Sequence, residues 1–245
     1  MNQVVRLANK ANVAIIAMED VTNKNMFTDA LMSGLADAFA AVKRQAETRA
    51  VVLCGYDTIF SAGGTKEELL RINAGELQFT DISLYDLLLD CAVPVIAAMQ
   101  GHALGGGLAL GCYADAMVLA DESIYSANFM NYGFTPGFGS TYIIPHRFGA
   151  VFGNEILFSG KNYFGREIKE RGTGIKVEKK KDVLNAAWEI AAEIAEKPKL
   201  PLTLLKTHLT ERIRAELPPM VAKEIKMHKA TFGQPEVARR INEGF

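Results

Sequence analysis

Short apolar runs and longer amphipathic stretches succeed each other along the first half of the chain. The runs at Asn12–Met18 and Ala50–Cys54 are rich in β-branched residues and have the length of buried strands. The stretch between them carries apolar residues at helical spacing, at Leu31, Leu35, Phe39 and Val42. This alternation predicts a strand–helix–strand unit.

Two further apolar runs, Pro94–Met99 and Asp115–Ala120, repeat the strand pattern, with room for only a brief helix between them. Strands that follow one another through helical connections usually pair in parallel and are covered by those helices. The predicted fold class is therefore α/β.

From about Asp182 onward only helical spacing remains. Just before this point, the lysine run at residues 179–181 is typical of a solvated turn, with contact to an acidic partner as the alternative. The predicted helices, separated by prolines, are Asp182–Glu196, Pro201–Glu216, Pro218–Phe232 and Glu236–Asn242. We expect a core over residues 1–190 and a C-terminal helical segment over residues 191–245.

Composition and charge narrow the class of function. The 245 residues are 49% hydrophobic, enough for one large core, and 27 basic against 28 acidic residues give a formal net charge of −1. We therefore expect no nucleic-acid partner. No apolar run reaches the roughly 18 residues of a membrane span, and Met1–Lys10 lacks the apolar part of a secretory signal. Three widely spaced cysteines without neighbouring histidines favour a cytoplasmic protein without a zinc site.

Two glycine-rich turns follow predicted strands, at residues 60–66 (FSAGGTK) and 101–109 (GHALGGGLA). Glycine at a strand–helix junction exposes backbone N–H groups at the positive end of a helix. Two such groups aimed at one point form an oxyanion hole, which stabilises an enolate. Neither turn matches a dinucleotide or phosphate-loop fingerprint, and either turn alone is better explained by backbone geometry.

Taken together, the segments Ala62–Gly64, Ala98–Gly107 and Gly133–Thr141 resemble the three signature segments of the crotonase (enoyl-CoA hydratase/isomerase) superfamily in order and spacing. The resemblance spans almost the whole chain. It implies a repeated ββα superhelix with a C-terminal trimerising segment, and an active site that this segment completes. It also implies that the N–H groups of Gly64 and Gly106 hold a thioester oxygen.

Two positions depart from the hydratases of this superfamily. Their catalytic glutamates fall on Ala109, two residues past the glycine triplet, and on Phe129, four residues before the third segment. Addition of water requires a positioned base and acid, which alanine and phenylalanine do not supply. A dry pocket beside Phe129 favours enolate chemistry without hydration, for instance decarboxylation.

A decarboxylation that forms an enolate also needs a proton donor, and histidine is the usual one near neutral pH. Of the four histidines, His102, His146 and His208 are interpreted as structural. His228 lies in an apolar helical stripe, where a packed core histidine is the common outcome. Glu224, four residues earlier, is a candidate partner that would favour the protonated ring. On the residues alone, both roles of His228 remain open.

A closer resemblance decides between them. The stretches Phe60–Ile72, Phe79–Asp81, Leu89–His102, Phe129–Gly137 and Met227–Phe232 are similar to the second enoyl-CoA-hydratase-like enzyme of polyketide β-branching cassettes, a methylglutaconyl decarboxylase. The resemblance implies a substrate carried as a thioester on an acyl carrier protein, polyketide synthase modules as partners and a homotrimer. It makes His228 catalytic, and it places Ala62 and Phe129 at the substrate.

One position departs from this pattern too. The family has a lysine, thought to engage the substrate carboxylate, where this chain has Gln78. Glutamine donates hydrogen bonds but carries no charge, so the role passes to another residue or activity is weakened. Lys66 is the nearest candidate in sequence, although a solvated helix residue is the plainer interpretation.

The sequence thus predicts a decarboxylase that converts a 3-methylglutaconyl thioester to a 3-methylcrotonyl-type thioester. No metal or other cofactor is expected, because the thioester itself accepts the electrons. Two alternatives remain: another crotonase activity on an acyl-CoA, such as isomerisation or hydration, and a catalytically silent scaffold with the same fold.

Overall fold

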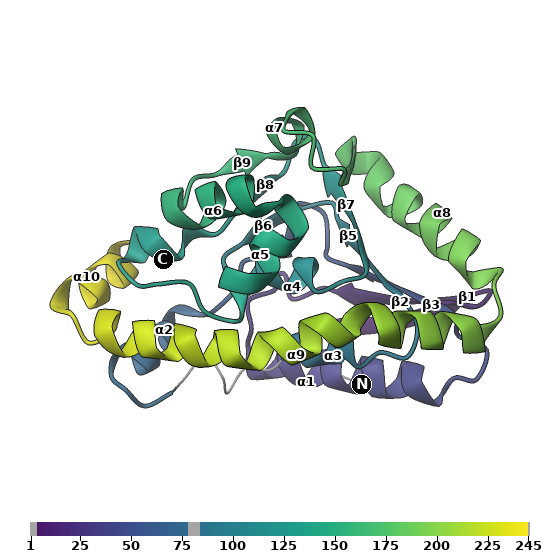
Figure 1. Ribbon diagram of the computed structural model, residues 1–245, viewed down its shortest axis with the longest axis horizontal. Helices are drawn as coiled ribbons and strands as arrows, with labels where there is room; N and C mark the ends of the chain where they lie inside the picture. The colour runs from purple at the N-terminus through teal and green to yellow at the C-terminus, as the bar shows by residue number, and fades with distance from the viewer. Residues whose placement is uncertain (1–3, 78–83, 245) are drawn as a thin grey trace.

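The larger of two β-sheets forms the centre of the computed structural model, which describes residues 4–77 and 84–244 (Figure 1). Its strand order is β1-β2-β3-β5-β7-β10. The strands are β1 (Val5–Lys10), β2 (Val13–Met18), β3 (Ala50–Cys54), β5 (Val95–Met99), β7 (Ala116–Ala120) and β10 (Lys176–Glu178). All neighbours pair in parallel except β1 and β2, which are antiparallel. The predicted parallel strands are confirmed.

A second sheet of short strands, in the order β4-β6-β8-β9, was not predicted from the hydrophobic pattern, although the superfamily resemblance implied a ββα repeat. It consists of β4 (Ile59–Ser61), β6 (His102–Leu104), β8 (Ile124–Ser126) and β9 (Tyr163–Phe164). β4, β6 and β8 each follow directly on a strand of the larger sheet, and β4 and β6 lead into α2 (Lys66–Asn73) and α4 (Gly106–Cys112). This repeat of two strands and a helix is the predicted ββα superhelix.

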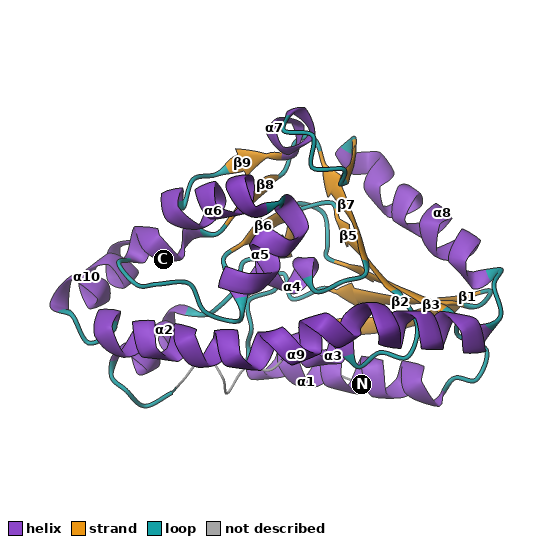
Figure 2. Cartoon of the chain, in the orientation of Figure 1, coloured by secondary structure: helices purple, strands orange, loops and turns teal. Residues whose placement is uncertain are grey.

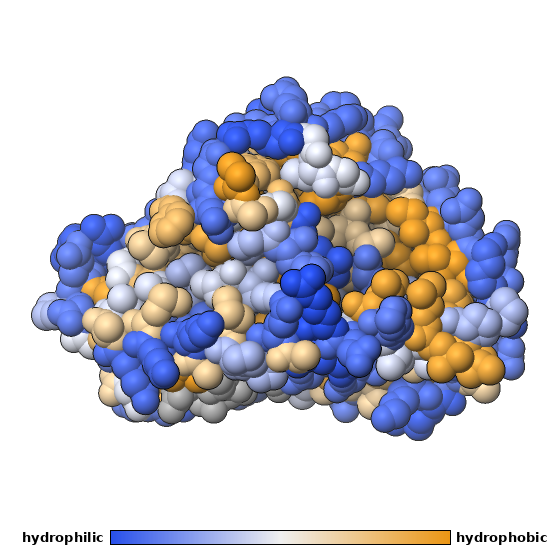
Figure 3. Space-filling model, viewed as in Figure 1, coloured by the Kyte–Doolittle hydropathy of each residue, from blue (hydrophilic) through white to orange (hydrophobic). Residues whose placement is uncertain are grey.

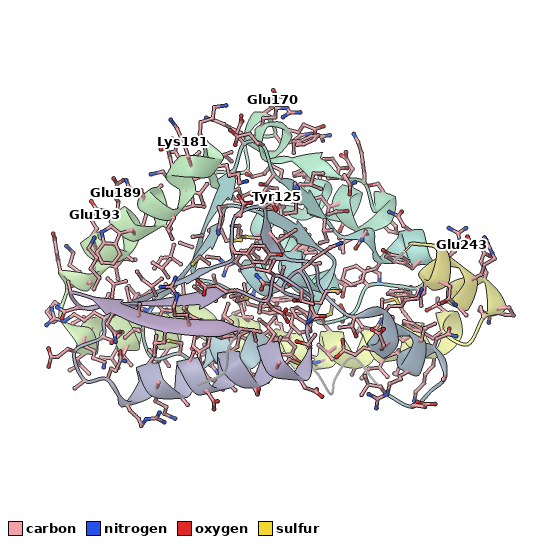
Figure 4. All side chains as sticks on the ribbon, turned by 180° about the vertical axis from the view of Figure 1, so that it is seen from behind. Tyr125, Glu170, Lys181, Glu189, Glu193 and Glu243 are labelled. Atoms are coloured by element: carbon pink, nitrogen blue, oxygen red, sulfur yellow. The ribbon has the colours of Figure 1, made fainter. Side chains whose placement is uncertain are left out.

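Tyr125 of β8 ties the two sheets together. Its hydroxyl donates to the Met99 carbonyl at the end of β5 (2.6 Å) and accepts from the Ala120 N–H at the end of β7 (2.7 Å). In Figure 4 the labelled Tyr125 lies in the interior, whereas Lys181 and Glu189 point away from the molecule. Because β6 and β8 are held against the ends of β5 and β7, the turns between them have fixed positions.

Helices cover both faces of the larger sheet (Figure 2). On one face, Val51 and Leu53 of β3 pack in a core with α1 (Asp29–Arg44), whose N-terminus is capped by the Thr28 side chain. On the other face, Val52 packs with the alanine-rich side of α8 (Val183–Ala195). The remaining elements are α3 (Leu84–Leu89), η2 (Asn128–Tyr132), α5 (Ser140–Phe148), α6 (Ala150–Ser159), α7 (Gly165–Glu170) and η3 (Lys180–Asp182).

A single helix of 33 residues, α9 (Lys199–Thr231), replaces two predicted helices, so the predicted break at Pro218–Pro219 is wrong. The prolines remove two backbone hydrogen bonds, but their fixed φ is compatible with a helix. Ile213, Leu217 and Val221 are buried on both sides of the pair and hold the helix against the body of the protein. α10 (Pro235–Gly244) follows, and the predicted boundary between residues 190 and 191 falls inside α8.

The charged and apolar segments lie largely as expected. Lys179 and Lys180 pair with Asp121 and Asp57 at the surface, in agreement with a solvated turn. Cys54 and Cys112 are buried, whereas Cys91 is partly exposed. Within residues 4–77 and 84–244, no helix is long and apolar enough to cross a membrane.

Candidate active site

The two glycine-rich turns meet at the point where β4 and β6 lead into their helices. Gly63 has φ +83°, a conformation that favours glycine, and a Cβ placed on it would lie 3.0 Å from the Gly106 nitrogen and 2.7 Å from the Leu104 carbonyl oxygen. A Cβ on Gly107 would lie 2.2 Å from the Ser61 carbonyl oxygen. The two turns therefore pack backbone against backbone, which explains why the sequence has glycine at each contact.

Gly64 and Gly106 both line a cavity of about 320 Å³ beside this contact. Gly106 is the first residue of α4, so its N–H is one of the four that a helix leaves without an internal partner. In the described part of the chain, neither the Gly64 N–H nor the Gly106 N–H has a hydrogen-bond partner. Unpaired backbone donors on two residues that line one cavity are what an oxyanion hole requires.

The lining of this cavity contains no aspartate or glutamate among the described residues. Phe129, from η2, is 5% exposed and lies in the wall. Ala109 is fully buried on α4, one helical turn from Gly106. The rest of the wall is mainly apolar and includes Phe27, Leu69, Leu104, Phe134 and Phe138. The side chains that would activate a water molecule in a hydratase are therefore replaced by apolar ones.

His228 lies on α9 and is 7% exposed. Its Nε2 is 3.0 Å from the Thr135 carbonyl oxygen and 3.1 Å from the Pro136 carbonyl oxygen. Because both oxygens only accept, Nε2 carries a hydrogen. Burial lowers the pKa of His228 below its usual 6.5, while the two carbonyl hydrogen bonds act in the opposite direction.

A second cavity, of about 350 Å³, contains His228 in its wall together with Leu77 and Lys229. An aromatic pair stands between the two cavities: Phe134 lines the first, Phe232 lines the second, and their ring centroids are 4.5 Å apart in a stacked arrangement. The His228 and Phe232 rings are nearly perpendicular, with their centroids 5.5 Å apart. The backbone donors and the imidazole thus lie on opposite sides of one aromatic contact.

The predicted pairing of Glu224 with His228 is wrong. The Glu224 carboxylate is turned toward the start of α5, where it accepts hydrogen bonds from the backbone of Gly139 and from Thr141. His228 is held by backbone carbonyls instead. Helical spacing of four residues allowed the pair, but the buried backbone donors of a neighbouring element compete for the carboxylate more effectively.

Comparisons with known proteins agree with this geometry. The family model for enoyl-CoA hydratase/isomerase matches residues 8–244. The chain belongs to the enoyl-CoA hydratase/isomerase family. Among this family's members, it is 46% identical over 226 residues to "Bacillaene synthase decarboxylase PksI" of Bacillus subtilis (strain 168), an alignment covering 92% of this chain and 91% of that protein.

Two solved structures of the enoyl-CoA hydratase/isomerase fold are similar over nearly the whole chain. One, described as part of a dehydratase/decarboxylase enzyme couple involved in polyketide β-branching, has a TM-score of 0.98 and 44% identity, and covers 100% of this chain and 97% of its own. The ECH2 decarboxylase domain of CurF from Lyngbya majuscula has a TM-score of 0.95 and 42% identity, with 99% of each chain covered. The predicted resemblance to the decarboxylases of polyketide β-branching is confirmed.

The structure brings some of the predicted site residues together and leaves others apart. Ala62, Gly64, Gly106 and Phe129 line the first cavity. Lys66 does not line either cavity; its Nζ donates to the Asn242 carbonyl of α10 at 3.2 Å. Gln78 lies outside the described residues. Their roles in catalysis and substrate binding stay predictions.

The other histidines have structural surroundings. The His102 Nδ1 accepts from the Ile124 N–H at 2.9 Å, and its pKa is lowered by burial. His146 stacks on Tyr142, and His208 is exposed beside Glu211. This arrangement agrees with a structural interpretation of His102 and His146, whereas His208 is a surface residue and not the packing or cap residue that its position beside Leu205 and Leu209 suggested.

Phe138 and Lys229 are among the cavity-wall residues that were missed. Phe138, which lines the first cavity, has φ +62°, an uncommon value for a residue with a side chain. Lys229 follows His228 in sequence and lines the second cavity. For Phe138 the sequence did give a signal, because it is enclosed by Gly137 and Gly139 in the third signature segment. For Lys229 nothing distinguished it from other exposed helical lysines.

Proposed function

We propose that this protein decarboxylates a 3-methylglutaconyl thioester, carried on an acyl carrier protein, to a 3-methylcrotonyl-type thioester. The proposal is supported by the relatives at 42–46% identity, which are described as decarboxylases. One observation about the site carries it: a cavity with two unpaired backbone donors and, among the described residues that line it, no carboxylate. Such a cavity stabilises an enolate but does not activate water.

The bond changes follow from the substrate. The bond between the terminal carboxylate and the neighbouring carbon breaks, CO₂ leaves, and the electron pair spreads through the conjugated chain onto the thioester oxygen. The N–H groups of Gly64 and Gly106 stabilise the negative charge on this oxygen. The thioester accepts the electrons, so the proposed reaction needs no metal and no cofactor.

His228 then delivers a proton to the terminal carbon. Since its Nε2 hydrogen is shared between the Thr135 and Pro136 carbonyls, the proton comes from Nδ1 of the imidazolium. The negative substrate favours this charged form when it binds. The Phe134 and Phe232 rings lie between the cavity of the oxyanion donors and that of the imidazole, so the proposed reaction requires that the conjugated acyl chain pass beside this pair to reach both.

The carboxylate and the carbon that receives the proton are joined by one bond, so the residue that binds the carboxylate lies near His228. Lys66 is hydrogen-bonded to α10 and lines neither cavity. Lys229 lines the cavity of His228, and within the described part of the chain it has no ion pair or hydrogen bond through its side chain. We therefore assign Lys229 as the cationic partner of the substrate carboxylate.

The proposed assembly is a cytoplasmic homotrimer that interacts with the acyl carrier protein and with polyketide synthase modules. A cyclic trimer joins two different patches of each subunit, whereas a twofold dimer joins a patch to itself. Six of the ten exposed large hydrophobic residues in the described part of the chain form two groups on different elements: Leu200, Leu204, Leu205 and Leu209 on the first half of α9, and Val151 and Phe158 on α6. In Figure 3, hydrophobic surface gathers over the first half of α9, with a smaller area over α6.

Product analysis tests the reaction. Purified protein is incubated separately with 3-methylglutaconyl and crotonyl thioesters of a carrier protein, and the acyl groups are weighed by mass spectrometry. We expect CO₂ loss from the first substrate and no change in the second. Hydration of either substrate without CO₂ loss contradicts the proposal.

A further inference from the structure

Glu224 is a buried carboxylate whose hydrogen bonds all point away from the two cavities. It is 1% exposed and lies one helical turn before His228 on α9. Its Oε2 accepts from the Gly139 N–H at 2.8 Å, and its Oε1 accepts from the Thr141 N–H at 2.9 Å and the Thr141 hydroxyl at 2.6 Å. Burial raises the pKa of the Glu224 carboxyl, and the hydrogen bonds from Thr141 and Gly139 act in the opposite direction by stabilising its ionised form.

These donors belong to the first turn of α5, a helix that does not cap itself. Gly139 occupies the N-cap position, where it has no side chain to accept from the following N–H groups. Glu224 supplies the missing acceptor from another helix, and its negative charge lies at the positive end of α5. The partner of this helix end is therefore 85 residues further along the chain.

The segment in front of α5 is held in a strained conformation. Phe138 has φ +62° and Gly139 has φ +70°. The Tyr113 hydroxyl donates to the Phe138 carbonyl at 2.8 Å, on the same short stretch that Glu224 binds through the Gly139 N–H. A residue with a side chain adopts a positive φ only when its surroundings determine it, and strain of this kind gathers at functional sites.

This segment reaches both halves of the site. The Phe138 side chain lines the cavity of Gly64 and Gly106. Three and two residues earlier, the carbonyls of Thr135 and Pro136 hold the Nε2 of His228. The segment at residues 135–141 is thus hydrogen-bonded to α9 at two points. The Glu224 carboxylate binds its backbone N–H groups, and the His228 imidazole binds its backbone carbonyls.

We propose that Glu224 is a positioning residue, whose carboxylate holds the segment at residues 135–141 in place. The carbonyls of Thr135 and Pro136 in this segment then orient the His228 ring, and the Phe138 ring completes the wall of the oxyanion cavity. The proposal rests on the proposed function only in taking His228 as the proton donor. A residue that merely capped α5 would change stability without changing the state of the His228 ring in the folded protein.

Glu224→Gln tests this role with little change in size. Glutamine has one acceptor oxygen and an NH₂ group, so its NH₂ faces either the Gly139 N–H or the Thr141 N–H, donor against donor. The matched control is Glu167→Gln on α7, whose carboxylate accepts from the Phe164 N–H at 2.8 Å at another helix start. In Figure 1, α7 lies at the opposite edge of the molecule from α9.

Two readouts separate positioning from capping. At a temperature where all variants are folded, Glu224→Gln is expected to lower kcat by about a hundredfold, as for other displacements of reacting groups, whereas Glu167→Gln keeps the wild-type kcat. The ¹⁵N chemical shifts of the His228 ring are expected to show pure Nε2–H tautomer in the wild type and in Glu167→Gln, and a mixture of tautomers in Glu224→Gln.

Equal kcat values and an unchanged His228 spectrum in both variants overturn the proposal and leave Glu224 as a cap. If Glu224→Gln does not fold, Thr141→Val is used instead, because it removes one of the three hydrogen-bond donors. Thr141→Val is expected to give a mixture of His228 tautomers, whereas Thr141→Ser, which keeps the hydroxyl, is expected to keep the wild-type tautomer. The proposal is equally overturned if Thr141→Val leaves the spectrum unchanged. The ring spectrum needs no turnover, so a wild-type protein that releases no CO₂ refutes the proposed function without deciding the role of Glu224.

Discussion

Two adjacent glycines, Gly63 and Gly64, are expected to differ in how well they tolerate substitution by alanine. A Cβ on Gly63 would lie 2.7 Å from the Leu104 carbonyl oxygen and 3.0 Å from the Gly106 nitrogen. The first distance is shorter than non-bonded contacts allow, so Gly63→Ala pushes the two turns apart. The positive φ of +83° adds strain of about 1–2 kcal/mol. On Gly64 the nearest atom to a new Cβ is Leu69 Cδ2, at an ordinary 3.8 Å.

The expected magnitude follows from the oxyanion hole. Displacement of the Gly106 N–H removes one of two donors, and the loss of one such donor typically lowers kcat by about 10²–10³, or about 2.7–4 kcal/mol. Gly63→Ala is therefore expected to lower kcat for CO₂ release by about two orders of magnitude and Tm by several degrees. Gly64→Ala brings no atom closer than 3.8 Å to the new Cβ, so its Tm is expected to stay close to that of the wild type, because substitutions at open positions rarely change stability by more than about 0.5 kcal/mol.

The assay is CO₂ release from the methylglutaconyl thioester, measured at a temperature at which thermal melts show all three proteins to be folded. The binding of a saturated thioester serves as a check that the cavity is still open. Wild-type kcat in a folded Gly63→Ala variant would refute the argument that the contact between the two turns places the oxyanion donors.

Three further predictions concern the second cavity. His228→Ala is expected to lower kcat by about 10²–10⁴ with a small change in KM, measured by steady-state kinetics. Burial lowers the pKa of His228, and the proton donor has to be protonated, so kcat/KM is expected to fall as the pH rises through a value below 6.5. In the profile of kcat this fall is expected at higher pH, because the bound negative substrate favours the protonated ring. Rates measured across the pH range check both expectations, and a fall in kcat/KM that occurs only above pH 6.5 is the contrary result. The wild-type protein is expected to bind glutaryl-pantetheine, which has a terminal carboxylate, more tightly than butyryl-pantetheine, and Lys229→Gln is expected to abolish this difference in equilibrium binding. Lys226→Gln on the same helix is the control and is expected to keep the difference. If both variants keep it, Lys229 does not bind the carboxylate.

The parallel sheet was predictable because local pattern and tertiary structure agree there. The runs that became β2, β3, β5 and β7 are continuous and β-branched, as expected of strands buried on both faces. The strands of the second sheet have only two or three residues each. So short a run carries no periodicity, and their pairing depends on tertiary contacts that a sequence pattern does not express.

The single helix α9 was missed for a related reason. A proline pair is a strong local signal for a helix end, and it was overruled by burial on both sides of Pro218 and Pro219. Within the site, the position of the two glycine-rich turns was predictable, because their backbones lie so close together that Gly63 and Gly107 leave no room for a side chain. The partner of Glu224 was not, since the acceptor of an uncapped helix end can come from anywhere in the chain.

The direct test of the central claim is the mass of the product formed from 3-methylglutaconyl carrier protein in D₂O. An oxyanion-stabilised dienolate that His228 protonates gives a 3-methylcrotonyl thioester that has lost CO₂ and gained a single deuteron at the terminal carbon. A hydrated product that retains its carboxylate, or an unchanged substrate in the presence of folded protein, contradicts the account.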